Sequence, residues 1–401
     1  MSIDASAVPL EAWMEYLPLG SVSICELALP IAHNAATRQV KCLPREVLYK
    51  HAPFLGNPEP GCWNFNCLGA SIGSSFAGSV ANCQSQSITE LLQGGIRGLD
   101  LRVSMHEGDV WVSHSVITTS SLISVLKEVH RFLTNHVGEV VLVLIKRDWD
   151  QPGFDLPENW ARCAEIIESV FRLQEEDCGG GSQELGLGLG LGSGSSYASE
   201  GERQPALCQD GDLDLGLDTL RRLGRRAMVA VEAPPSMYTG YTSCGSGGSG
   251  GSGSDPSSRG LLLPSGVPLS VVPLGDANLT SSWCDEVSTV EDMTDVLELW
   301  AREGLCKGER GTLRILEVAL PGFPSWKAPQ ANHALRRWLY RHRRRCQREV
   351  PTCTLAEVPL AESDQCMRTP PLARKEVLSV AVKLDFPDEE TVRDILRDNF
   401  H

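Results

Sequence analysis

The sequence predicts an α/β protein folded as an irregular barrel of the TIM type, (β/α). Apolar runs of strand length alternate along the chain with stretches whose apolar residues recur at helical spacing. This order of elements is typical of a ring of parallel strands enclosed by helices. Eight strands are expected, and the second and third follow one another with no helix between them, which makes the barrel irregular.

The strands are predicted from short apolar runs bounded by turn residues. The first covers about 22 to 29 and is expected to end at Pro30. The segment from Gln93 to Ser115 holds the second and third, and the run V-V-L-V-L-I that follows is typical of a parallel strand buried on both faces. The strands after the first are predicted at 96–103, 109–113, 140–145, 227–231, 269–274, 313–319 and 378–384.

The helices are predicted from apolar residues three and four positions apart. The clearest stripe covers 120–136. An arginine-rich helix at 330–345 is interpreted as a solvated surface balancing an acidic protein, with contact to an anionic membrane as the alternative. The other helices are predicted at 87–93, 157–171, 290–303 and 389–397.

Length allows one barrel-sized domain or two smaller ones. We predict one domain over 1–401, because strands of the same character resume after flexible Gly/Ser-rich insertions at about 178–216 and 243–259; a long irregular loop is expected at 41–83. The net charge of -15 argues against a nucleic-acid partner. The sequence has no run of about 18 apolar residues that would span a bilayer. Its first residues also lack the features of a signal peptide. We therefore expect a cytoplasmic monomer that contacts membranes only peripherally.

The fourteen cysteines are interpreted as reduced structural thiols, because no export signal accompanies them. Cys62 and Cys67 are five positions apart and Cys83 lies beyond them. This spacing lacks the two tight pairs of a zinc site, so no metal site is predicted.

Two histidines are expected just past strand ends, His33 after the first strand and His114 after the third. Either histidine taken alone could be an ordinary polar side chain whose hydrogen bonds are made within the fold. Together with Arg102 they suit cleavage of a phosphodiester by an internal hydroxyl. One imidazole would remove the hydroxyl proton and the other would protonate the departing alkoxide, while the guanidinium stabilises charge on the phosphoryl oxygens.

These residues lie in segments that together resemble the X domain of the phosphatidylinositol-specific phospholipases C. The likeness is greatest to the small, single-domain eukaryotic proteins that contain this domain. The resemblance implies a phospholipase C-like phosphodiesterase barrel, and its order and spacing cover nearly the whole chain outside the Gly-rich insertions. The segments that carry it are L-A-L-P-I-A-H-N-A-A-T at 27–37, C-Q-S-Q-S-I-T-E-L-L-Q-G-G-I-R-G-L-D-L-R-V at 83–103, V-W-V-S-H at 110–114, L-K-E-V-H-R-F-L at 126–133 and E-V-V-L-V-L at 139–144.

The resemblance also implies roles for the two histidines. His33 corresponds to the general base that activates the inositol 2-hydroxyl, and Asp385 to the carboxylate that orients it. His114 corresponds to the general acid that protonates the diacylglycerol oxygen. The implied partner is a phosphoinositide-type lipid at a membrane surface, and the products are diacylglycerol and an inositol phosphate, initially cyclic.

The remaining site residues follow from the same resemblance. Arg102 corresponds to the cation on the phosphate, Asp100 to the acid that supports it, and Lys146 and Asn34 to substrate contacts. The calcium-dependent branch of the family has carboxylates where this chain has Arg102 and Lys146, so we expect no metal and no cofactor. Asn34 departs from the acid that backs the second histidine in calcium-independent relatives.

Two other readings of the sequence stay open. The first is a weakly active or inactive relative that binds lipid or a protein partner through the same pocket. The second is another barrel phosphodiesterase, of the glycerophosphodiester or sphingomyelinase D kind. Enzymes of that kind need a magnesium-binding cluster of acids near the first histidine, and the segment from Asp100 to Arg102 lacks one.

Overall fold

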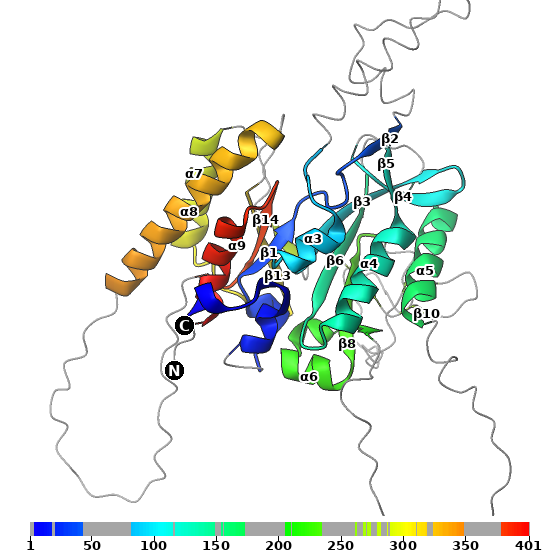
Figure 1. Cartoon of the computed structure of the whole chain (residues 1–401), viewed down its shortest axis with the longest axis horizontal. Coiled ribbons are helices and arrows are strands. Elements are labelled where there is room, and N and C mark those ends of the chain that lie inside the picture. Colours follow the sequence, from blue (N-terminus) through cyan, green and yellow to red (C-terminus); the bar gives the residue numbers. More distant parts are fainter. Residues whose placement is uncertain are drawn as a thin grey trace, which may run out of the picture.

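The structure is a computed structural model of the chain, and its centre is one curled sheet flanked by helices (Figure 1). The residues that it describes are 4–17, 21–42, 82–114, 117–148, 154, 156–172, 205–209, 211–234, 261–262, 268–269, 271–273, 279–281, 287, 289–309, 311–318, 324–348 and 378–400. Predictions for the rest of the chain, including the insertion at 243–259 and most of the loop at 41–83, lie outside them.

Eight strands form a parallel path through the sheet, which confirms the predicted (β/α) barrel class. All neighbours on the path pair in parallel. Among the described strands, β11 and β12 stand at the two ends of the path. In spatial order the strands are β11 (Val272–Pro273), β8 (Arg225–Val231), β6 (Val141–Arg147), β3 (Gly98–His106), β1 (Leu29–Ala32), β14 (Ala381–Leu384), β13 (Leu313–Glu317) and β12 (Leu279–Ser281).

The third predicted strand is not a barrel strand. It is β4 (Asp109–Ser113), which pairs antiparallel with β3 and with β5 (Ile117–Ser121), while β5 also pairs with β2 (Val40–Cys42). Only Glu107 and Gly108 separate β3 from β4, and both have positive φ, 51° and 78°. Such a two-residue turn can only join antiparallel neighbours, because a parallel return needs a long crossover. The eighth place in the barrel belongs instead to β12, which the sequence did not predict.

The prediction for the first strand was also wrong in its bounds. The range 22–29 holds a 3-10 helix, Ile24–Glu26, closed by a capping box between Ser23 and Glu26. The strand β1 follows it and includes Pro30, which was expected to end it. The proline fits because pairing between β1 and β3 begins one residue later, at Ile31, so the ladder loses no hydrogen bond at Pro30.

Five other strands, at 96–103, 140–145, 227–231, 313–319 and 378–384, are confirmed as β3, β6, β8, β13 and β14. The run at 269–274 is divided between two strands. Its start belongs to β10 (Pro268–Leu269), which pairs antiparallel with β9 (Leu261–Leu262), and its end to β11. The predicted insertion at 178–216 is shorter than expected, because β7 (Ala206–Leu207) within it pairs with β8.

The predicted helices are confirmed, with shifted ends. The one expected at 330–345 is longer, since α8 begins at Pro324 and includes Pro329. Helices α3, α4 and α5 pack in succession, as do α7, α8 and α9. No helix among the described residues is both long and apolar enough to cross a bilayer. The helices are α3 (Ile88–Gln93), α4 (Leu122–Asn135), α5 (Pro157–Arg172), α6 (Leu217–Arg222, not predicted), α7 (Val290–Arg302), α8 (Pro324–Arg348) and α9 (Glu389–Leu396).

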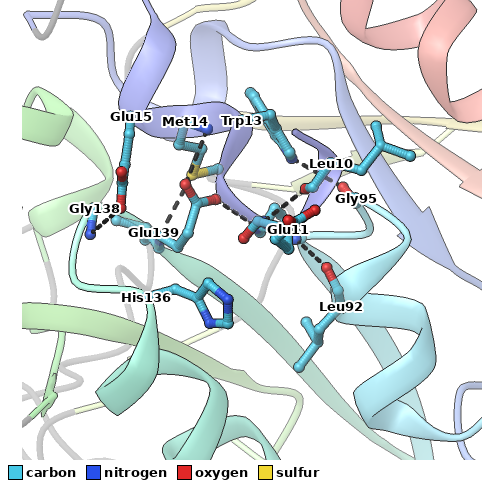
Figure 2. A network of polar contacts seen from close by, with 12 residues as sticks. Leu10, Glu11, Trp13, Met14, Glu15, Leu92, Gly95, His136, Gly138 and Glu139 are labelled. Carbon is cyan, nitrogen blue, oxygen red and sulfur yellow. Dashed lines mark hydrogen bonds and ion pairs between the residues drawn. The ribbon is translucent and has the colours of Figure 1, made fainter. Parts of the chain in front are cut away.

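A buried ion pair ties the N-terminal segment to the sheet. Arg97, directly before β3, is fully buried and donates through Nε to Glu139 Oε2 at 2.6 Å. Its other nitrogens donate to backbone carbonyls of α3 and of the 3-10 helix Leu10–Tyr16. Figure 2 shows the polar contacts around Glu139. Because the charge is both paired and hydrogen-bonded, the N-terminal segment is held against the beginning of β3 at a tolerable desolvation cost.

Replacing Arg97 by methionine should destabilise the fold by about 3–5 kcal/mol, because Glu139 is then left buried without its cation. Urea unfolding of the purified protein measures the loss. The control is Arg38→Met, which breaks an exposed pair with Glu90 and should cost less than about 1 kcal/mol. Equal losses in the two variants would contradict the role given to Arg97.

Candidate active site

A layer of charged side chains lies inside the sheet at the carboxyl ends of its strands. Residues in register on neighbouring strands, and residues two apart on one strand, point to the same face. Lys383 is in register with Ile31 and with Glu317, and Arg102 with Lys146. The alternation places His33 two positions after Ile31, Asp385 two after Lys383, and Asp100 two before Arg102 on this same inner face.

Lys383 is the centre of the layer. Its Nζ lies 3.0 Å from Asp100 Oδ2 and 2.8 Å from Glu317 Oε1, and all three side chains are buried. Burial alone would raise the pKa of Asp100, but the charges of Lys383, Lys146 and Arg102 hold it well below its usual range. Burial alone would lower the pKa of Lys383, and its two carboxylate partners raise it above its usual value instead. Asp100 and Lys383 are therefore charged together at neutral pH.

His33 is fixed by a buried carboxylate. Its Nδ1 lies 2.8 Å from Asp385 Oδ1, and His33 and Asp385 are 8% and 2% exposed. The backbone is held as well, because His33 N donates to Leu384 O and Gln84 Nε2 donates to His33 O. A carboxylate accepts, so Nδ1 carries the proton and Nε2 is the unprotonated nitrogen that a base requires.

His114 approaches His33 from the antiparallel arm rather than from the end of a barrel strand. It follows β4, and its ring centroid is 6.3 Å from that of His33. The expectation that both histidines end barrel strands was therefore wrong for His114, because β4 belongs to the antiparallel arm. The two rings are nevertheless brought together, across a separation of about 80 positions in the sequence.

Cys83 lies beside both histidines, and no part in the site was predicted for it from the sequence. Its Sγ is 3.6 Å from His114 Nδ1 and 3.5 Å from Asn34 Nδ2, and the residue is fully buried. Burial raises the pKa of the Cys83 thiol well above its usual value, and the charge of Asp385 adds to this effect. Asn34 has a left-handed backbone, with φ of 43°, which asparagine tolerates better than most residues. The thiol occupies a place beside His114 Nδ1 where the family resemblance implied an acid.

The cations on the inner face complete the site. Arg102 and Lys146 are half-buried and adjacent in register, and Glu232 comes directly after β8 on the next strand. Burial lowers the pKa of Lys146, against the opposing charge of Asp100. An anion that enters between the histidines would therefore meet two cations whose charges are only partly offset.

Lys383→Met should destabilise the protein by about 3–5 kcal/mol, because the buried carboxylates of Asp100 and Glu317 would lose the cation that they share. The matched control is Lys127→Met on the exposed side of α4, for which a change within about 0.5 kcal/mol is expected. Urea unfolding midpoints compare the two. If the stability of the Lys383 variant falls no further than that of the control, the interior ion cluster does not hold the strands as described.

The curled parallel sheet and the helices around it define a (β/α) barrel, with a charged layer inside the carboxyl ends of its strands. Solved structures of bacterial phosphatidylinositol-specific phospholipases C share this fold. The enzyme from Listeria monocytogenes has a TM-score of 0.55 at 14% identity, covering 98% of this chain and 99% of that one. A pentafluoro-phenylalanine form of the Staphylococcus aureus enzyme has a TM-score of 0.54 at 9% identity, covering 98% of each chain. No protein-family model matches the sequence, and no curated protein matches it.

Proposed function

We propose that the protein cleaves a phosphoinositide-type lipid as a phosphatidylinositol-specific phospholipase C of the X-domain type. The observation that carries the proposal is the pair of imidazoles, 6.3 Å apart, with a buried carboxylate on the first. Arg102 on the same inner face is the third element. General acid, general base and phosphate-binding cation are the groups that this reaction requires.

In the first step His33 acts as the base. Its Nε2 takes the proton of the inositol 2-hydroxyl, and the oxygen attacks phosphorus to form a cyclic phosphodiester. Asp385 keeps the ring oriented and stabilises the imidazolium that forms. Arg102 and Lys146 stabilise the charge on the phosphoryl oxygens during the attack.

In the same step His114 acts as the acid. It gives a proton to the diacylglycerol oxygen as the bond from phosphorus to that oxygen breaks. Water then opens the cyclic phosphate with the proton transfers reversed. Cys83 lies beside His114, and Asn34 contacts Cys83, so the pair contributes to the orientation of His114 without supplying a negative charge at neutral pH.

The test uses the purified full chain and vesicles that contain phosphatidylinositol. His33→Ala and His114→Ala should each lower the rate of inositol phosphate release by about two to four orders of magnitude. The matched control is His130→Ala on helix α4, which should keep the rate of the wild type. Equal background rates in the wild type and the two site variants would reject the enzymatic proposal.

Calcium independence is the second expected property, because cations stand where the calcium-dependent branch has acids. The rate on phosphatidylinositol vesicles should be unchanged by a chelator selective for calcium, and calcium added back should not raise it. Loss of activity on chelation with recovery on magnesium would instead favour a barrel phosphodiesterase of the glycerophosphodiester or sphingomyelinase D kind.

A weakly active or inactive lipid-binding protein is the second candidate, and one observation favours it. Cys83 Sγ contacts His114 Nδ1, and burial holds the pKa of that thiol well above its usual value. Cys83 therefore supplies no negative charge at neutral pH that would stabilise an imidazolium at His114. Vesicle binding that persists without turnover in the wild type would support this candidate.

A further inference from the structure

We propose that Cys83, His33, Asp385 and His114 form a binding site for a thiophilic divalent cation of the zinc type. The sequence spacing of the cysteines predicted no such site. The fold brings the four residues together from four separate segments of the chain.

The positions of the ligand atoms suit one small ion. One ligand atom each from His33, Cys83 and Asp385 lie within 4.8 Å of one another. His114 Nδ1 is 3.6 Å from Cys83 Sγ, which adds a fourth donor. Tetrahedral zinc, with bonds of about 2.0–2.3 Å, holds its ligand atoms roughly 3.3–3.8 Å apart. Small side-chain rotations would therefore close His33, Cys83 and Asp385 around an ion, and a rotation of the His114 ring beside Cys83 would add the fourth ligand.

Burial also favours a cation here, and the ligands themselves can balance its charge. Cys83, Asp385 and His33 are 0%, 2% and 8% exposed, so few waters would compete for the ion. One thiolate and one carboxylate balance the charge of a divalent ion. The neighbouring ammonium of Lys383 is already paired with Asp100 and Glu317, which reduces its repulsion of the ion.

The residues around Cys83 are arranged as an outer shell. Asn34 Nδ2 reaches Cys83 Sγ at 3.5 Å, and an amide N–H of this kind stabilises a metal-bound thiolate. Asn34 is 1% exposed, and its Oδ1 has no hydrogen-bond partner among the described residues. The backbone of Cys83 is fixed at both ends, because its N–H donates to Thr37 Oγ1 and its carbonyl accepts from Phe386 N. The thiol is thus held in place before an ion arrives.

The donor types select the ion. A thiolate with one or two imidazoles suits zinc, whereas calcium and magnesium prefer oxygen ligands alone.

On binding, the thiol proton leaves to solvent and sulfur bonds to the metal. An ion on His33 Nε2 occupies the lone pair of the base directly, and an ion on Nδ1 obliges the ring proton to move to Nε2. In both cases His33 can no longer accept a proton, so zinc would inhibit the enzyme; this consequence rests on the proposed function, whereas the binding does not.

The binding test uses the purified full chain with Zn²⁺, and with Co²⁺ as a spectroscopic substitute. The wild type should show a cobalt–thiolate charge-transfer absorption that zinc abolishes by displacement. Cys83→Ser should weaken zinc binding by at least about 10–100-fold, the loss typical even of outer-shell partners. Cys163→Ser, a change at another fully buried cysteine, is the matched control for the other thiols of the chain and should bind as the wild type does.

Asp385→Asn provides a second variant in which the thiol is intact, and it should also weaken binding. Identical zinc affinities for the wild type, Cys83→Ser and Asp385→Asn, or a cobalt–thiolate absorption that survives in Cys83→Ser, would overturn the proposed site. Zinc inhibition is measured on phosphatidylinositol vesicles, each variant being compared with its own zinc-free rate. Binding without any turnover in the wild type would overturn the proposed function alone, and turnover without Cys83-dependent binding would overturn the metal site alone.

Discussion

The site depends on two buried ion pairs, which the ammonium of Lys383 forms with Asp100 and with Glu317. Three strands of the barrel, β3, β14 and β13, supply these three groups, and β1 with His33 lies between β3 and β14. Charges inside a sheet are tolerated only when they are paired and hydrogen-bonded. The cluster therefore allows this end of the barrel to be polar, and a polar interior is what a phosphate-handling site requires.

One buried ion network lies directly before β3, and a second lies along the first half of the strand. Arg97 and Glu139 lie before the strand and join the N-terminal segment to α3, which is a structural task. Asp100 and Arg102 lie on the strand and face the histidines. In barrels of this kind the carboxyl ends of the strands carry the chemistry and the opposite end carries stability. The same short segment of sequence, from Arg97 to Arg102, thus serves both ends of the barrel.

The sequence predicts most of the fold because continuous apolar runs such as 140–145 have few alternatives to a buried parallel strand. It misplaces the first strand, because Pro30 can lie in β1 only when the pairing with β3 starts after it, and that register is not visible in the sequence. It also misassigns β4, because the two-residue turn before β4 decides the direction of the strand. Lys383 could have been found, since it lies two positions before Asp385 and must share its face. Cys83 could not, because it follows an irregular segment without periodicity and meets Asn34 from 49 positions away. The roles of His33, His114 and the other site residues stay predictions.

The central claim is that His33 and His114 face one phosphate-sized space beside Arg102. Nitrogen-15 NMR of the histidine side chains during titration with myo-inositol 1-phosphate tests it most directly. The ring resonances of both His33 and His114 should shift together along one binding curve, while those of His130 and His106 stay in place, and Arg102→Met should weaken the binding. Shifts confined to one of the two site histidines, or binding that does not depend on Arg102, would contradict the account.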